Sequence, residues 1–222
     1  MKRKIAILFV FILCASLFLT GGKPKLISED EAKAAGLAFI NHVFDVNLTE
    51  ATVEYGTHAA ASYVDGEYLE TGEEQPVYFY VVKLVEDEYT APLYLALVNA
   101  ETGVVYYAEQ SYSHVPKMNK AQLEIWTKAY GKGEVDAFDY LRVDIDCKDF
   151  AREWIPQKFD LKAQILGMID CGMMADTDGA HNCFFVVIRD GTIYYVDMAW
   201  PQMTILSVGI LNETRPYMGV LL

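Results

Sequence analysis

The sequence predicts an α+β protein made of two related modules, each a helix packed on an antiparallel β-sheet. Three observations support this prediction. A helix with a strong start signal opens the first half, short runs rich in β-branched and aromatic residues follow it, and a similar order of elements recurs in the second half. The chain has 222 residues, of which 53% are hydrophobic and 22% are charged, the balance of a globular protein.

The first predicted helix covers residues 29–44. Its start is marked by Ser28-Glu29-Asp30-Glu31, a capping box in which the Ser28 hydroxyl accepts from the Glu31 amide and the Glu31 carboxylate accepts from the Ser28 amide. Apolar side chains then recur at helical spacing and form one face; they are Ala32, Ala35, Phe39, Ile40 and Val43.

Short strands are predicted after this helix. β-branched and aromatic residues are concentrated in runs separated by turn signals; the runs are 52–55, 59–64, 77–85, 93–98 and 104–107. The segment Ala100-Glu101-Thr102-Gly103 predicts a tight turn between the last two. A meander of this kind can rest one face of its sheet on the preceding helix.

The second half repeats the plan with variation. We predict a connecting helix over 121–129 that stops at Gly131, and a second helix that starts at Asp146 and ends at Pro156. Four strand-like runs follow, at 163–169, 184–188, 193–196 and 204–210. Asp190-Gly191 between two of these runs is a strong hairpin signal.

The two halves match best near their ends. The run 94–98 aligns with 184–188, and the run 104–108 aligns with 192–196. An acid-Gly turn separates the two runs in each half, and the second run carries a Tyr-Tyr pair in each. This similarity indicates an internal repeat.

These motifs resemble a known family. The Ser28-Glu29-Asp30-Glu31-Ala32 helix start and the strands ending in Val98-Asn99-Ala100-Glu101-Thr102-Gly103-Val104-Val105 look like the PepSY domain and, more loosely, the PepSY-like repeats of YcdB-type secreted proteins of Gram-positive bacteria. The resemblance is good over about 27–110 and only loose over 145–210. It implies a helix on an antiparallel sheet in a PepSY/cystatin-like arrangement. It also implies an exported protein that regulates or inhibits peptidases or binds a partner at the cell surface.

The N-terminal segment indicates export. Residues 1–22 combine a basic start, an apolar run and small residues before Lys23, which is the order of a signal peptide. An uncleaved anchor is the alternative, and it would be the only membrane contact. We therefore predict a signal peptide over 1–22, a PepSY-like module over 23–114, a divergent module over 115–222, and a secreted or cell-surface location.

Charge excludes one class of partner. Eighteen Lys and Arg residues against 31 Asp and Glu residues give a formal net charge of −13. A chain with this much negative charge repels phosphate backbones. We therefore do not expect nucleic-acid binding.

Cys171 and Cys183 bracket a stretch rich in Gly, Asp and Asn, 172–182, that reads as a loop between two strands. An antiparallel pair closed by that loop would place the two cysteines within disulfide range, and export permits the bond. The alternative is that Cys147, Cys171 and Cys183 are all buried free thiols.

No pattern in the sequence specifies a reaction. The cysteines lack a nucleophile motif, and no set of residues has the number and spacing of a metal site, so we expect no enzyme activity, metal or cofactor. A small extracellular hydrolase using Cys183 or the pair Asp144 and Asp146 is one alternative, and a structural envelope component is another.

The tyrosines are the candidate binding residues. Because side chains alternate along a strand, adjacent tyrosines are expected to place one ring under the helix and the other on the exposed face. Exposed tyrosines suit a protein or peptide partner, for instance a peptidase. The candidates are Tyr78, Tyr80, Tyr106, Tyr107, Tyr194 and Tyr195.

Overall fold

The structure is a computed structural model, and it describes residues 25–58, 61–64, 67–70, 77–84, 92–130, 140–176 and 179–211. The predicted signal peptide at 1–22 lies outside these residues. The described part has three α-helices, which are α2 (Glu29–Phe44), α3 (Lys120–Tyr130) and α4 (Tyr140–Lys158), and a short 3-10 helix η1 (Tyr112–His114). No helix in the described ranges has the length and apolar character needed to cross a membrane.

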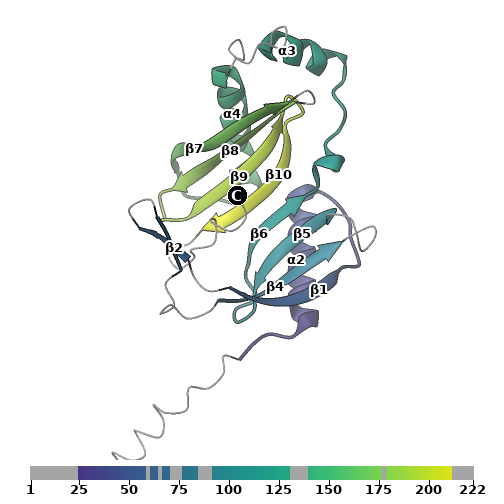
Figure 1. The fold of residues 1–222 in the computed structure, drawn as a ribbon, viewed down its shortest axis with the longest axis vertical. Coiled ribbons are helices and arrows are strands. Elements are labelled where there is room, and N and C mark those ends of the chain that lie inside the picture. The colour runs from purple at the N-terminus through teal and green to yellow at the C-terminus, as the bar shows by residue number, and fades with distance from the viewer. Residues whose placement is uncertain are drawn as a thin grey trace, which may run out of the picture.

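The described strands follow each helix in meanders (Figure 1). In the first half they are β1 (Thr52–His58), β2 (Ala61–Val64), β3 (Glu67–Glu70), β4 (Val77–Leu84), β5 (Tyr94–Asn99) and β6 (Val105–Gln110). In the second half they are β7 (Ile165–Asp176), β8 (Gly179–Ile188), β9 (Ile193–Trp200) and β10 (Thr204–Leu211).

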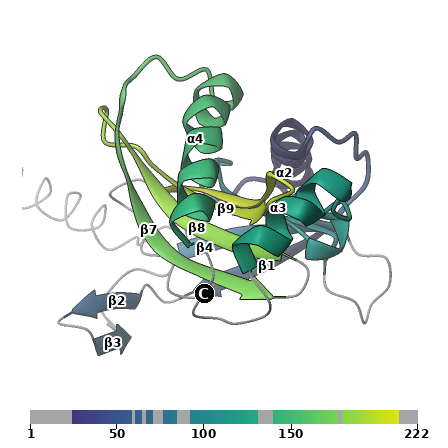
Figure 2. The ribbon, with the colours of Figure 1, turned by 90° about the horizontal axis from the view of Figure 1, so that it is seen from above.

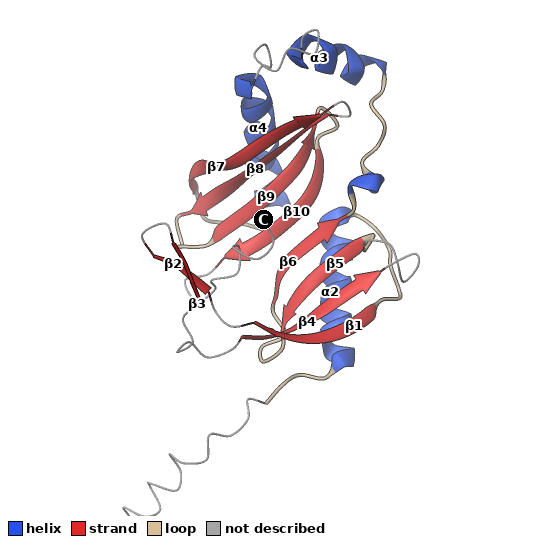
Figure 3. Cartoon of the chain, in the orientation of Figure 1, coloured by secondary structure: helices blue, strands red, loops and turns tan. Residues whose placement is uncertain are grey.

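Eight of these strands form one antiparallel sheet in the order β1-β4-β5-β6-β10-β9-β8-β7. The last strand of each half pairs with the other, β6 with β10, so the sheet runs through both halves (Figure 3). The predicted α+β class and antiparallel sheet are confirmed. Two separate modules are not evident, because the halves share a sheet.

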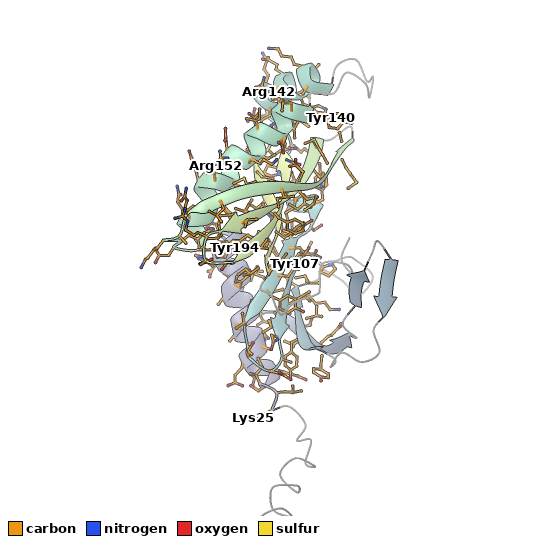
Figure 4. All side chains as sticks on the ribbon, turned by 90° about the vertical axis from the view of Figure 1, so that its left-hand side faces the viewer. Lys25, Tyr107, Tyr140, Arg142, Arg152 and Tyr194 are labelled. Atoms are coloured by element: carbon orange, nitrogen blue, oxygen red, sulfur yellow. The ribbon has the colours of Figure 1, made fainter. Side chains whose placement is uncertain are left out.

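Helices α2 and α4 lie on one side of this sheet. Seen from above, α2 and α4 lie on the same side of the strands, and the separate β2–β3 hairpin lies on the other (Figure 2). The side view gives the same arrangement (Figure 4). We call the side of the sheet away from α2 and α4 the open face; Leu97, Tyr107 and Tyr195 form part of a cluster there.

Helix α2 has the predicted bounds and the predicted start. The Ser28 side chain accepts from the Glu31 amide at 3.2 Å, and the Glu31 carboxylate accepts from the Ser28 amide at 2.8 Å. Farther along the helix, Gly36 lies directly on Val82 of β4: a Cβ placed on Gly36 would be 2.7 Å from the Val82 Cβ. The helix therefore packs on the sheet at a distance that only glycine permits at this position.

Helix α4 begins earlier than predicted. We expected a start at Asp146, but the helix begins at Tyr140 and runs through Pro156 to Lys158. The buried positions Val143, Cys147, Ala151 and Ile155 recur every fourth residue, and this spacing already starts before Asp146. The acidic residue was therefore a misleading start signal.

The segment 172–182 is not the loop that the sequence predicted. Strand β7 continues to Asp176 and β8 begins at Gly179, so most of the segment lies in a long hairpin. The many Gly, Asp and Asn residues of the segment obscure the alternation of buried and exposed side chains that is typical of a strand. Met173 and Ala175 pack against the core beneath the helices, and Ala180 is fully buried within that core.

The sheet register reveals an internal two-fold relationship at the centre. Each central strand carries one inserted residue, Tyr106 on β6 and Leu206 at the corresponding place on β10. Ala108 and Val208 face each other where β6 pairs with β10. The hairpin β5–β6 therefore corresponds to β9–β10, whereas the sequence comparison had matched it with β8–β9.

Contacts between the helices also tie the halves together. The carbonyl of Lys158 at the end of α4 lies 2.5 Å from His42 Nε2 on α2, and the Lys158 ammonium pairs with Asp45 at 2.6 Å. Val43 of α2 belongs to the same buried cluster as Phe184 and the inward residues of α4. The core is thus continuous beneath the centre of the sheet.

Candidate functional site

Two of the predicted binding tyrosines are core residues on the helix side of the sheet. Tyr80 is buried against α2, and its hydroxyl donates to the Ile27 carbonyl at 2.9 Å. Tyr194 packs on Phe159 with ring centroids 4.8 Å apart. Neither ring is available to a partner. The side chain of Tyr78 lies outside the described residues.

The other three lie on the open face. Tyr195 follows the predicted alternation, because it lies opposite to Tyr194. Tyr106 and Tyr107 do not alternate, since both belong to the open-face cluster. The reason is the bulge at Tyr106, which places two successive side chains on one face.

The predicted exposure of these rings is wrong. We expected one member of each Tyr-Tyr pair to stay partly wet, but all four side chains are buried, with exposed fractions between 4% for Tyr106 and 7% for Tyr107. Leu97 and Phe185 pack against Tyr106, Tyr107 and Tyr195 on the open face. The tyrosines therefore form the wall of a site more than a flat exposed surface.

A cavity of about 400 Å³ opens beside these tyrosines, and we call it the open-face pocket. It draws side chains from β6, β7, β8, β9 and β10 and from η1. Its lining residues are Tyr107, Glu109, Gln110, Tyr112, Met174, His181, Tyr195, Asp197, Leu206 and Ser207.

Two carboxylates give the open-face pocket its charge. Tyr107 donates its hydroxyl to the Glu109 carboxylate at 2.7 Å. Asp197 is mostly buried, and burial raises its pKa to about 6, with the nearby Glu109 charge contributing in the same direction. The Asp197 Oδ1 atom accepts no hydrogen bond from the described residues.

Burial also raises the pKa of Tyr107 and of Tyr195 well above the usual tyrosine value. The carboxylates of Glu109 and Asp197, respectively, add to that effect. Both hydroxyls are therefore neutral across physiological pH and act as hydrogen-bonding groups beside the acids.

The two cysteines of the predicted disulfide lie next to this site. Cys183 on β8 is paired in register with Gly172, the neighbour of Cys171, and the two thiols interact with each other. The Cys183 thiol donates to the Gly172 carbonyl at 3.2 Å. The structure holds both as free cysteines, so the bridge stays a prediction.

The cysteines considered as nucleophiles have raised pKa values, and the two carboxylates considered for hydrolysis have other partners. Burial raises the pKa of Cys147 to about 12 and that of Cys171 to about 12, and it also raises the pKa of Cys183. Asp144 pairs with Lys148 at 2.9 Å, whereas Asp146 accepts from the Trp200 indole at 3.0 Å. Within the described ranges, no group of three or more His, Cys, Asp or Glu side chains is placed to hold a metal ion.

A second cavity, of about 530 Å³, lies where η1 connects to α3. Its lining includes Tyr112, Met118 and Leu123, and Lys117 is the one charged side chain among the described lining residues. Among its described lining residues there are neither the two carboxylates nor the tyrosine pair of the open-face pocket.

Sequence reasoning missed Asp197 and Glu109. One signal was available for Asp197: it is a charged residue inside the apolar run of β9, which reads Ile-Tyr-Tyr-Val-Asp-Met-Ala-Trp. We had ended the predicted strand at 196, just before it. A charge in the middle of a buried strand breaks the local pattern and is typical of a site.

The chain matches no protein family and no curated protein sequence. Among solved structures it is similar to the Bacillus megaterium YpeB C-terminal domain, with a TM-score of 0.37 and 10% sequence identity. The similarity covers 83% of this chain and 63% of that one, so this chain spans less than two thirds of the matched structure.

Proposed function

We propose that this is an exported, non-enzymatic protein that binds a protein or peptide partner outside the cytoplasm through the open-face pocket. The observation that carries the proposal is the pocket itself, a cavity of about 400 Å³ that combines rigid tyrosines with two carboxylates. Tyrosine offers a large apolar ring and one polar end, which is why it is common in protein-binding sites.

The position of the pocket supports a macromolecular partner. It lies on the side of the sheet that neither α2 nor α4 covers, and Met174 at its lining is 73% exposed. A partner could therefore reach the pocket across the surface of β7. The PepSY resemblance suggests a peptidase as that partner, and regulation of its activity as the outcome.

The chemistry of the site favours binding over catalysis. A cysteine nucleophile acts as a thiolate, yet the raised pKa values of Cys171 and Cys183 keep both thiols protonated at neutral pH. The two tyrosine hydroxyls are neutral for the same reason. Export is proposed from the leader at 1–22, whose apolar run is short for a membrane span.

Site-specific photocrosslinking tests the binding face. A benzophenone amino acid at Met174 samples the open face, and the same group at Leu141 is the matched control, because Leu141 on α4 is 70% exposed on the helix side. We expect a partner from the secreted and surface proteome to crosslink at Met174 and not at Leu141. Purified partner then shows whether binding changes peptidase activity.

Two outcomes would contradict the proposal. Equal crosslinking at both positions would mean that the open face has no special role. Stoichiometric labelling of Cys183 by a thiol-directed activity probe, with Cys147 unlabelled, would favour the extracellular hydrolase instead.

A further inference from the structure

We propose that the open-face pocket accepts the cationic side chain of a lysine or arginine on the partner, with Asp197 and Glu109 supplying the countercharge. This inference rests on the proposed function, because it specifies what the partner presents to the site.

The first argument is charge balance. The pocket contains two carboxylates, and no lysine or arginine of the described residues lines it. Several other acidic groups have a cation: Asp144 and Asp170 share Lys148, and Lys158 pairs with Asp45. A carboxylate that is largely removed from water without a cation is costly, so the pocket is electrostatically incomplete.

The groups around Asp197 sharpen this argument. The charge of Glu109 on β6 disfavours the charged form of Asp197, whereas a hydrogen bond from the Met198 backbone favours it. The Asp197 carboxylate in turn disfavours ionisation of the Cys171 and Cys183 thiols on β7 and β8. Tyr195 on the same strand is affected in the same direction. The buried Oδ1 of Asp197 accepts no hydrogen bond from the described residues. A cation in the pocket would favour the charged form of Asp197 and would offset its repulsion with Glu109.

The lining also suits the stem of a long cationic side chain. Lysine and arginine carry their charge at the end of an apolar chain, which packs well along apolar surfaces. Met174 and Leu206 offer such a surface, and Tyr112 and Tyr195 add aromatic rings. Aromatic rings also attract cations through their faces. The pocket therefore matches both parts of the side chain.

Protonation of Asp197 would make this binding sensitive to pH. Because its pKa is raised to about 6 without a bound cation, Asp197 is charged at pH 7.5 and largely neutral at pH 5. Binding of a cation should therefore be stronger at the higher pH. The other titratable side chains in the lining are Glu109, His181 and the three tyrosines Tyr107, Tyr112 and Tyr195.

The test uses defined peptides and the chain without its leader, residues 23–222. The tripeptide Ac-Ala-Lys-Ala-NH2 and its arginine analogue are titrated into labelled protein, and amide shifts are followed by NMR. The peptide with norleucine in place of lysine is the control, since it keeps the stem and lacks the charge. We expect saturable shifts around Ser207 and Gly209 for the cationic peptides, and about tenfold weaker binding at pH 5 than at pH 7.5.

Variants separate the pocket from the acidity of the whole chain. Asp197→Asn should weaken binding of the lysine peptide by about tenfold or more. Glu101→Gln removes one charge from an exposed turn and should leave binding unchanged. Equal losses in the two variants would mean that the peptide responds only to net charge, and the inference would be wrong.

Other results would overturn the inference in distinguishable ways. Equal binding of the norleucine and lysine peptides would show that the pocket recognises apolar stems alone. Saturation of the same amides by Ca²⁺ at lower concentration than by either peptide would identify an inorganic cation site. If Met174 crosslinks a partner while no cationic peptide binds, the proposed function stands and this inference fails; if neither occurs, both fail.

Discussion

Tyr107 and Tyr195 lie on the same face of the sheet, in strands on either side of β10, and the residue between them is Gly209. Gly209 pairs in register with Tyr107 on one side and with Tyr195 on the other. A Cβ on Gly209 would lie 3.4 Å from the Tyr195 Cβ and 3.5 Å from the Tyr107 Cδ2. The two tyrosines, one from each half of the chain, therefore close over a glycine where the halves join.

A larger side chain at Gly209 should separate the tyrosines. We predict that Gly209→Leu lowers the free energy of unfolding by about 1–3 kcal/mol, because the added atoms have no room between the rings. Gly209→Ala is the matched control: its Cβ fits at ordinary contact distance, and it should leave stability unchanged or raise it by about 0.5–1 kcal/mol. Urea denaturation of the two variants measures the difference. A Leu variant as stable as the Ala variant would contradict the close approach of the rings.

Much of the architecture could be predicted because local signals and tertiary packing agree. The capping box predicted both where α2 begins and the hydrogen bonds at that end of the helix. The predicted Asp190-Gly191 turn lies between β8 and β9, and Gly191 has a φ of 92° there. The joining of the halves could not be predicted, because strand pairing between β6 and β10 depends on register over a long sequence separation.

The candidate site was harder to predict than the fold. Tyr107 and Tyr195 were identified as candidate binding residues. The bulge at Tyr106, however, places the side chains of Tyr106 and Tyr107 on the same face of the sheet instead of on opposite faces, and no residue type in that apolar run signals a bulge. The pocket also depends on Asp197 and Glu109, which come together only because β9 and β6 are both neighbours of β10. Alternation within one strand carries no information about which strands become neighbours.

Gly36 should be irreplaceable where α2 crosses β4. Alanine favours helices by about 1 kcal/mol over glycine, yet the Cβ of Gly36→Ala would lie 2.7 Å from Val82. We predict that this variant lowers the free energy of unfolding by about 1–3 kcal/mol, because the helix must move away from the sheet. Thermal and urea unfolding measure the change.

A double-mutant cycle provides the control for Gly36. Val82→Ala removes two of the three close contacts, those of the methyl groups, so Gly36→Ala should cost less in that background. A coupling of at least about 0.5 kcal/mol is expected for residues in direct contact. Additive effects of the two substitutions would show that Gly36 is not limited by Val82.

Oxidation should select one pair of cysteines. We predict that oxidised glutathione joins Cys171 to Cys183 within one chain and leaves Cys147 unmodified, because Cys147 is fully buried beneath the sheet. The raised pKa values keep little thiolate at pH 7, so the reaction should be faster at pH 9. Non-reducing peptide mapping identifies the bond.

The Cys147→Ser variant is the control for oxidation, and it should form the same bond at the same rate. The bridge should raise stability by about 3 kcal/mol, as expected for a short closed loop. Glutathione adducts that remain on Cys171 without a bridge would argue that the two sulfurs do not reach bonding geometry.

Asp197 should lower the stability of the fold while it serves the pocket. Its pKa is raised from 3.8 to about 6, so the folded state binds this proton more tightly than the unfolded state does. Stability contributed by this group is therefore greatest below pH 4 and falls as pH rises to 6. The loss above pH 6 should be on the order of 2–3 kcal/mol.

Replacing this carboxyl by its neutral isostere tests the sign directly. Asp197→Asn should raise the free energy of unfolding at pH 7.5, where Asp197 is charged, and the gain should vanish near pH 4, where the carboxyl is already protonated in the folded state. Urea unfolding of both proteins from pH 4 to pH 8 measures the difference, with Glu101→Gln as the exposed control. The same substitution should weaken binding of the lysine peptide. A variant that gains stability and loses binding separates a functional charge from a structural one, whereas loss of both would mean that Asp197 holds the sheet together.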